Sequence, residues 1–387
     1  MKWIASAAFG MEGMTGRDLK RLGAENVNVL SIGGAEFEGG FDIGMKANLW
    51  LRTADHVHLV LAEKKVLRFD DLFEFIKTIP WADYIARDNA FPVRAHCVKS
   101  QLMSESDCQK ICKKAIADVL ESRYHISRLP ETGASVQIDV DIRDNLARVS
   151  LDASGEPLSK RGYRTWNGEA PLRETLAAAL VLTSDWHPWQ PLYDPCCGTG
   201  TLLIEAAFIA LNRAPGLRRA FAMEDWGFVN KDELEAVRRQ AQSRYDECYL
   251  RKIDIAGSDI DPEAIELAKR HVKQAGLSDR IQLNVADLRD VALTGEPGML
   301  IANPPYGERL GDVRAAHAVA RQLGALYKRC RGWGMSVFSA DMGFEREFGY
   351  YASRRHRFYN GKIECEYHMF APDSKPVINK YKRGGGK

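Results

Sequence analysis

The chain has 387 residues, so two or three domains are expected rather than one compact core. Its 45% hydrophobic and 27% charged residues are ordinary for a soluble globular protein. The formal net charge of +2 does not by itself indicate a nucleic-acid partner, so any basic surface must be local. No run approaches the ~18 apolar residues of a membrane span, and the N-terminus lacks the architecture of a signal peptide. We therefore expect a cytoplasmic protein.

The cysteines and histidines do not indicate a metal site. The eight cysteines lack paired zinc-ligand spacing, which favours reduced thiols. His56 and His58 alternate on a predicted strand, but no third ligand is evident, so we interpret them as surface histidines. No metal is expected.

The N-terminal segment, to about residue 155, alternates between short strands and helices. A hairpin is expected across Arg143-Asp144-Asn145, and Ser104 is expected to cap a long amphipathic helix. The pattern predicts a small α+β region with strands at 2–9, 54–61, 92–98, 136–142 and 146–151, and helices at 15–22, 69–79 and 104–124.

From about residue 160 the pattern changes to strand, glycine-rich turn and helix. Strands are expected at 192–193, 253–257, 281–285, 299–302 and 335–339, with helices at 171–183, 201–212, 262–275 and 315–330. This alternation predicts an α/β fold with a doubly wound parallel sheet and ligands at the carboxyl ends of its strands. A hairpin around Asn360-Gly361 supplies an antiparallel edge.

Two further segments fall outside this pattern. Residues 212–252 are a charged, tryptophan-containing insertion, which we interpret as a lid or a substrate contact. Residues 373–387 are basic and glycine-rich and are expected to be disordered.

The loop Asp194-Pro195-Cys196-Cys197-Gly198-Thr199-Gly200 has the composition of a cofactor-binding turn. Gly198 and Gly200 lack Cβ atoms where a ligand must touch the backbone. The carboxylate of Asp194 is suited to hold a cationic amino group or to order the loop. A purely structural turn is the alternative interpretation.

Three aspartates follow the next two strands. Asp259 is placed to receive both ribose hydroxyls, whereas Asp261 precedes Pro262 and fits a helix N-cap. Asp287 is placed to accept a hydrogen bond from an adenine amino group, with an ordinary turn as the alternative.

The tetrad Asn303-Pro304-Pro305-Tyr306 at the end of an apolar strand carries the predicted catalytic residues. An aromatic amine is a poor nucleophile because its lone pair is delocalised, and two acceptors holding its hydrogens help the nitrogen become tetrahedral. The Asn303 side chain and the Pro304 carbonyl are the expected acceptors, held rigidly by the two prolines. Tyr306 offers a ring for stacking on an extruded base. The tetrad predicts methyl transfer to the amino nitrogen of a nucleobase.

Two segments, residues 160–166 and 354–359, mix cationic side chains with aromatic rings, which suits phosphate neutralisation with base stacking. Ordinary charged surface is the alternative. The candidate RNA-binding residues are Lys160, Arg161, Arg164, Arg354, Arg355 and Arg357.

In combination these motifs resemble a known family, the THUMP-domain class I methyltransferases, and especially the bacterial 23S rRNA guanine-N2 methyltransferase group often labelled N6-adenine-specific DNA methylases. The stretches that carry the resemblance are 161–164, 170–178, 194–201, 204–207, 303–307 and 359–361.

The resemblance implies a Rossmann-like methyltransferase domain and S-adenosylmethionine as cofactor. The implied domains are a ferredoxin-like element at 1–43, a THUMP RNA-binding domain at 44–155, the methyltransferase at 160–372 and the tail at 373–387. The cofactor is expected at Asp194, Cys196, Gly198, Gly200, Asp259, Ile260, Asp287, Leu288 and Asn303.

The function that the resemblance implies is methylation of guanine N2 in 23S rRNA or a large-subunit precursor. Alternatives are guanine-N2 methylation of tRNA, N6-adenine or N4-cytosine methylation of DNA, and a non-catalytic RNA-binding assembly factor. The tetrad does not separate one amino base from another. The front region argues against DNA, since a DNA enzyme would more often carry a sequence-reading module. The oligomeric state is not indicated.

Overall fold

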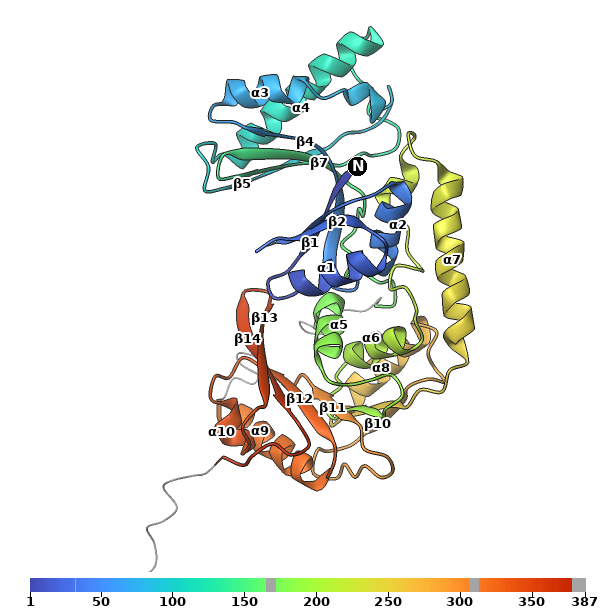
Figure 1. Cartoon of the computed structure of the whole chain (residues 1–387), viewed down its shortest axis with the longest axis vertical. Coiled ribbons are helices and arrows are strands. Elements are labelled where there is room, and N and C mark those ends of the chain that lie inside the picture. Colours follow the sequence, from blue (N-terminus) through green and yellow to red (C-terminus); the bar gives the residue numbers. More distant parts are fainter. Residues whose placement is uncertain (32, 165–171, 306–312, 378–387) are drawn as a thin grey trace, which may run out of the picture. The chain divides into compact units, whose positions relative to one another are not determined.

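The computed structural model describes residues 1–31, 33–164, 172–305 and 313–377 (Figure 1). The chain folds into two compact units. The N-terminal unit comprises Met1–Ala8, Glu12–Leu158 and Ala214–Ser243. The C-terminal unit comprises Phe9–Met11, Ser159–Arg213 and Arg244–Lys387.

One seven-stranded sheet organises the N-terminal unit, in the order β2-β3-β1-β4-β7-β6-β5. The pair β5–β6 is parallel, whereas β1, β3, β4 and β7 pair antiparallel with their neighbours. The strands are β1 (Lys2–Ala7), β2 (Glu25–Val29), β3 (Gly34–Glu38), β4 (Ala54–Lys65), β5 (Val93–Val98), β6 (Ile138–Arg143) and β7 (Leu146–Asp152).

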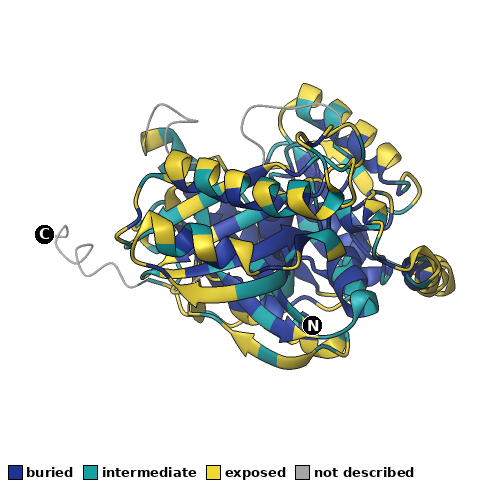
Figure 2. Ribbon diagram, turned by 90° about the horizontal axis from the view of Figure 1, so that it is seen from above, coloured by how far each residue is buried: buried dark blue, intermediate teal, exposed yellow. Residues whose placement is uncertain are grey.

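The helices of this unit are α1 (Glu12–Arg21), α2 (Phe41–Trp50), α3 (Phe69–Lys77) and α4 (Glu105–Tyr124), with a short 3-10 turn, η1 (Trp81–Asp83). Ser104 caps α4 by accepting a hydrogen bond from the Asp107 amide at 3.3 Å, as predicted. Burial alternates along the inner strand β1, whereas the edge strand β2 is largely exposed; Figure 2 colours each residue of the ribbon by its burial.

The predicted insertion contributes to this N-terminal unit. Its residues Ala214–Ser243 belong to this unit and include η2 (Ala222–Asp225) and most of α7 (Lys231–Tyr249). The Gly216 amide donates to the carbonyl of Leu49 at 3.0 Å, and Trp226 is only 1% exposed. The insertion therefore packs on α2, which is a structural role that the sequence interpretation as a lid or substrate contact did not anticipate.

A second seven-stranded sheet organises the C-terminal unit, in the order β10-β9-β8-β11-β12-β14-β13. The strands from β10 to β12 run parallel, and β14 and β13 add the predicted antiparallel edge. The strands are β8 (Leu192–Asp194), β9 (Ile255–Asp259), β10 (Gln282–Val285), β11 (Met299–Ala302), β12 (Gly334–Ser339), β13 (Arg354–Asn360) and β14 (Ile363–Phe370).

The strand order reverses between β8 and β11, because β9 and β10 extend the sheet on one side of β8 while β11 and β12 extend it on the other. Ligands of doubly wound sheets bind at such a switch point. The helices of the unit are α5 (Glu174–Thr183), α6 (Thr201–Ala210), α8 (Pro262–Gln274), α9 (Val313–Arg329) and α10 (Phe344–Phe348). The predicted fold class is confirmed.

Two of the predicted segment boundaries do not coincide with those of the structure. The predicted division between residues 43 and 44 falls inside α2, so the first element continues through this helix. The expectation of disorder from residue 373 is wrong for residues 373–377, since Val377 donates a backbone hydrogen bond to Gly349 at 2.9 Å. Residues 378–387 lie outside the described residues. Within the described part of the chain, every helix is too short or too polar to cross a bilayer.

Candidate active site

A cavity opens at the carboxyl ends of the central strands of the C-terminal unit. Asp194 ends β8, Asp259 ends β9 and Asn303 follows β11. The cavity has a volume of about 650 Å³, which is ordinary for a small-molecule site. Its lining includes every predicted cofactor residue except Gly200, namely Asp194, Cys196, Gly198, Asp259, Ile260, Asp287, Leu288 and Asn303.

Backbone hydrogen bonds fix the loop between β8 and α6. The Cys196 amide donates to Oδ1 of Asp194 at 3.0 Å, and the Gly198 amide donates to Oδ2 of Asp259 at 2.8 Å. The carbonyl of Thr199 accepts from Nδ1 of His271 at 3.1 Å. The loop is thereby tied to both β9 and α8, which gives it a rigid shape.

The two loop glycines serve different purposes. Gly198 has a φ of +49°, and a Cβ at this position would meet no protein atom within 4 Å, because the residue faces the cavity. Gly200 has a φ of +80°, and its Cβ would lie 3.3 Å from Cβ of Ala268 on α8. Gly198 therefore leaves room for a ligand, whereas Gly200 lets the loop turn and pack on α8.

Asp194 is the most enclosed acid of the cavity, at 1% exposure. Burial raises the pKa of its carboxyl well above the usual range, and the nearby charge of Asp259 raises it further. A ligand with a cationic amino group would favour the ionised form. This environment suits the role predicted for Asp194.

Asp259 and Asp261 lie two residues apart and have different positions, and the helix cap predicted for Asp261 is present. Asp261 caps α8, accepting from the Glu263 amide at 2.8 Å, and Pro262 occupies the first turn. Asp259 faces the cavity, and its Oδ1 accepts from the Asp261 amide at 3.1 Å. Ile260 lines the cavity although it is 67% exposed, which offers an apolar surface to a flat ring.

Asp287 is held on the other side of the cavity by its neighbour Arg289. The Arg289 guanidinium donates to both carboxylate oxygens at 3.0 and 2.7 Å, and its amide donates to Oδ1 at 2.8 Å. These hydrogen bonds lower the pKa of Asp287 to about 2. The group is therefore an ionised acceptor at neutral pH.

Asn303 has an unusual environment at the end of β11. Its side-chain oxygen is enclosed, yet it has no hydrogen-bond partner among the described residues. An unsatisfied buried acceptor costs roughly 1–3 kcal/mol, and its position in the lining of a cavity leaves this oxygen available to a donor on a ligand.

The other members of the tetrad are placed less directly. Pro304 is buried, and Pro305 is exposed and lines the cavity with Asn303. Tyr306, predicted to stack on a base, lies outside the described residues. The acceptor role of the Pro304 carbonyl remains a prediction.

Two of the predicted RNA-binding arginines are internal. Arg161 is 4% exposed and pairs with Glu205 of α6 at 3.5 Å. Arg164 donates to Oγ1 of Thr201 at 2.6 Å and pairs with Glu174 at 3.2 Å. Their guanidinium groups are enclosed and bind side chains of α5 and α6, which suits a structural role in holding these helices. This burial corrects the prediction that the two arginines contact phosphate.

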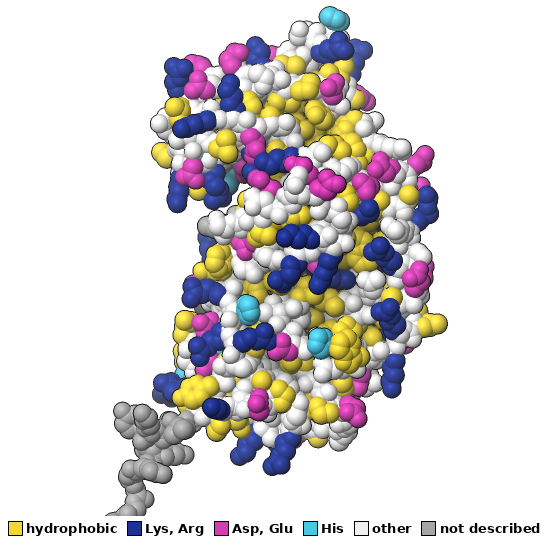
Figure 3. All heavy atoms as spheres, in the orientation of Figure 1, with side chains coloured by type: hydrophobic (Ala, Val, Ile, Leu, Met, Phe, Trp, Pro, Cys, Tyr) yellow, Lys and Arg dark blue, Asp and Glu magenta, His cyan; other side chains and the backbone are white. Residues whose placement is uncertain are grey.

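The remaining predicted RNA-binding residues are more accessible. Lys160 is exposed, and each arginine of β13 faces a carboxylate: Arg354 pairs with Asp185, Arg355 with Glu345, and Arg357 with Glu364. On the face drawn in Figure 3, basic and acidic side chains are interspersed. Their role in RNA binding remains a prediction.

Several lining residues were missed from the sequence. Val319 and Gln322 come from α9, and Leu172 precedes α5. The helical pattern of α9 predicts which face is buried but not that part of it borders a cavity. No local signal in the sequence identifies these residues.

Models of three protein families match the chain. They are described as the RlmL ferredoxin-like domain, matching residues 2–58, the THUMP domain, matching residues 67–152, and the RMKL-like methyltransferase domain, matching residues 161–369. The last match includes the whole cavity described above.

Individual relatives are similar over nearly the whole chain. "Putative RNA methyltransferase YpsC" of Bacillus subtilis (strain 168) is 37% identical over 97% of this chain and 97% of its own length. "Ribosomal RNA large subunit methyltransferase K/L" of Psychromonas ingrahamii is 36% identical over 94% of this chain, and the matched part is 49% of that longer protein. The crystal structure of SMU.472 complexed with SAH superposes with a TM-score of 0.90 at 37% identity, covering 96% of this chain and 97% of that chain.

Proposed function

Because the chain belongs to the THUMP-containing RMKL-like methyltransferase family, we propose that it methylates the exocyclic N2 amino group of a guanine in 23S rRNA. The cofactor is S-adenosylmethionine, in keeping with the SAH bound to SMU.472. It supplies an electrophilic methyl group. The cavity at the switch point of the sheet is where we place its nucleoside and amino acid.

The residues present fit this cofactor. Asp194 offers a buried carboxylate for a cationic amino group, and Asp259 offers a second carboxylate at the adjacent strand end. Ile260 provides an apolar surface for the adenine ring, next to the ionised acceptor Asp287. Gly198 leaves open space where the backbone must approach the ligand.

The observation that carries the proposal is the unpartnered side-chain oxygen of Asn303 in the lining of this cavity. It is placed to accept a hydrogen bond from the amino group of the target base. This hydrogen bond increases the electron density on the amino nitrogen. A preorganised acceptor of this kind stabilises the transition state more than the ground state. Most of the remaining rate enhancement comes from holding the nitrogen in line with the methyl group.

RNA is proposed as the polymer because a THUMP domain precedes the methyltransferase domain and because the names of two relatives specify RNA. Guanine N2 in 23S rRNA is the finer part of the proposal and rests on the resemblance of the tetrad and its flanking motifs. Guanine-N2 methylation of tRNA and amino methylation of DNA use the same chemistry and are the alternatives.

Asn303→Ala tests the chemistry. We expect unchanged affinity for SAH and turnover reduced by about 10²–10³-fold, the usual cost of losing one transition-state hydrogen bond. Asn284→Ala is the matched control, because Asn284 is exposed on β10 and does not line the cavity. Near-normal turnover of Asn303→Ala would show that the acceptor role is wrong.

The polymer is tested separately by mass spectrometry of nucleosides from rRNA, tRNA and DNA of a strain lacking the protein. Loss of N2-methylguanosine from large-subunit rRNA alone is the expected result. Unchanged rRNA with altered tRNA or DNA would replace the proposed substrate without changing the proposed chemistry.

A further inference from the structure

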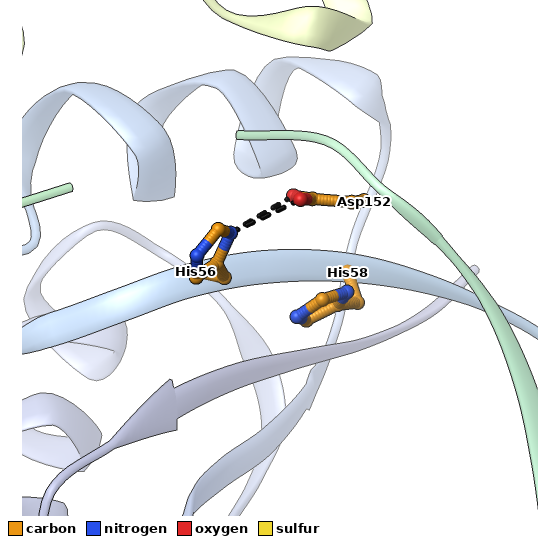
Figure 4. A group of neighbouring side chains, drawn as sticks. All are labelled: His56, His58 and Asp152. Carbon is orange, nitrogen blue, oxygen red and sulfur yellow. Dashed lines mark hydrogen bonds and ion pairs between the residues drawn. The ribbon is translucent and has the colours of Figure 1, made fainter. Parts of the chain in front are cut away.

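A cluster of histidines and carboxylates lies on one face of the sheet in the N-terminal unit. His56 and His58 alternate on β4 and share a face, while Val57 and Leu59 between and beyond them are buried on the other. The register places Asp152 of β7 directly opposite His58. Figure 4 shows the two imidazoles side by side, with the Asp152 carboxylate next to His56.

The Asp152 carboxylate is fixed in place before any ligand arrives. The residue is 1% exposed, and its Oδ1 accepts from the amides of Ser154 at 2.9 Å and Gly155 at 3.1 Å. Its Oδ2 lies 3.1 Å from Nδ1 of His56. Backbone donors that orient a carboxylate in this way are typical of the outer shell of metal sites.

His58 is incompletely satisfied. Its Nδ1 is enclosed and makes no hydrogen bond of acceptable geometry, although Oδ2 of Asp139 on β6 lies 3.3 Å away. The two histidine rings lie 5.7 Å apart at an angle of 29°. The Asp139 carboxylate is thus close to His58 but poorly aligned with it, and together with Asp152 it brings two carboxylates to two imidazoles on one face of the sheet.

We propose that His56, His58 and Asp152 bind a divalent transition-metal ion, with Zn²⁺ as the best match, and that Asp139 is the fourth donor. The ligand atoms of the first three lie within 4.8 Å of one another. A tetrahedral zinc with bonds of ~2.0–2.1 Å places its donors roughly 3.4 Å apart, so the side chains would draw closer together around the ion, with Asp139 joining through its contact to His58 at 3.3 Å. Two imidazoles with carboxylates are a donor set that zinc accepts readily.

The ion would join segments that are distant in the sequence. His56 and His58 end the region matched by the ferredoxin-like model, and Asp152 ends the region matched by the THUMP model. Since β4, β7 and β6 are neighbours in one sheet, a bound ion would hold three strands together. We therefore expect a structural role, separate from the methyltransferase chemistry.

The first test uses the full-length wild-type chain, stripped with a chelator and titrated with ZnCl₂ by calorimetry. We expect one tightly bound equivalent and a rise in the thermal midpoint on zinc addition, because the ion binds only the folded state. X-ray absorption of the zinc-loaded chain should show nitrogen and oxygen ligands with imidazole scattering. A sulfur shell would place the ion at the free cysteines, such as Cys97 and Cys108 with sulfurs 3.8 Å apart, and would overturn the proposal.

The second test uses His56→Gln and His58→Gln, with folding checked by circular dichroism. Each variant should bind zinc at least tenfold more weakly than wild type. His96→Gln is the control, because His96 is exposed and paired with Glu105 at 2.7 Å, and among the described residues this pair is not part of a group of three or more metal-ligating side chains. Wild-type zinc affinity in both cluster variants, or loss of binding in the control, would exclude this site.

Discussion

Replacing Gly198 by alanine separates two reasons for a glycine in the cofactor loop. Gly198 has a φ of +49°, so an alanine there pays the left-handed strain of about 1–2 kcal/mol. The added methyl meets no protein atom within 4 Å, and Gly198 lines the cavity, so the methyl would project into space that we assign to the ligand. Gly361→Ala is the matched control, with a φ of +65° and equally open surroundings in the β13–β14 turn.

Both variants should lose about 1–2 kcal/mol of unfolding free energy in urea, because the backbone strain is similar. Only Gly198→Ala should also weaken SAH binding, by tenfold or more, equivalent to at least ~1.4 kcal/mol. Isothermal titration calorimetry measures this affinity. The reasoning fails if Gly198→Ala binds SAH like wild type, or if Gly361→Ala loses affinity to the same extent.

Two further variants probe the buried charges around the cavity. Arg164→Ala leaves Glu174 without its partner at 3.2 Å and Thr201 without a donor, so it should lower the unfolding free energy in urea by ~3 kcal/mol; no loss would show that the pair is not structural. Burial, together with the charge of Asp259, raises the pKa of Asp194 in the folded state, so the folded chain binds a proton at Asp194 more tightly than the unfolded chain does. The free energy of unfolding therefore falls as the pH rises above about 3.9, the pKa of an aspartate in the unfolded chain. Asp194→Asn should therefore raise the urea midpoint at pH 7 but not at pH 3.5, while weakening S-adenosylmethionine binding; the opposite pH trend would contradict this.

Features that depend on local chemistry were predictable from the sequence. Ser104 and Asp261 cap their helices because a side-chain oxygen followed by polar first-turn residues satisfies free amides wherever the helix packs. The β6–β7 hairpin turns at Asp144 and Asn145, both with positive φ. The buried strand β11 was predicted with its bounds intact, because its four apolar residues end at consecutive prolines.

Features that depend on long-range packing were not predictable. Arg161 looked like surface charge because its partner, Glu205, lies 44 positions further along the chain and is itself fully buried. The hairpin at Asn360-Gly361 was located correctly, but register places Asn360 opposite Ile363, so the two loop residues are Gly361 and Lys362. His56 and His58 gained a third neighbour only when sheet order brought Asp152 beside them.

The packing of residues 214–243 on α2 constrains how this protein can be dissected. The polypeptide enters the N-terminal unit, leaves it after Leu158 and returns at Ala214, so no single cut separates the two units. A fragment truncated at Leu158 lacks Trp226 and Met223, whose side chains are almost fully buried within that unit. Such a fragment would expose apolar surface and tend to aggregate. A THUMP-containing fragment that stays folded would need residues 214–243 supplied again, either fused through a linker or co-expressed as a separate peptide.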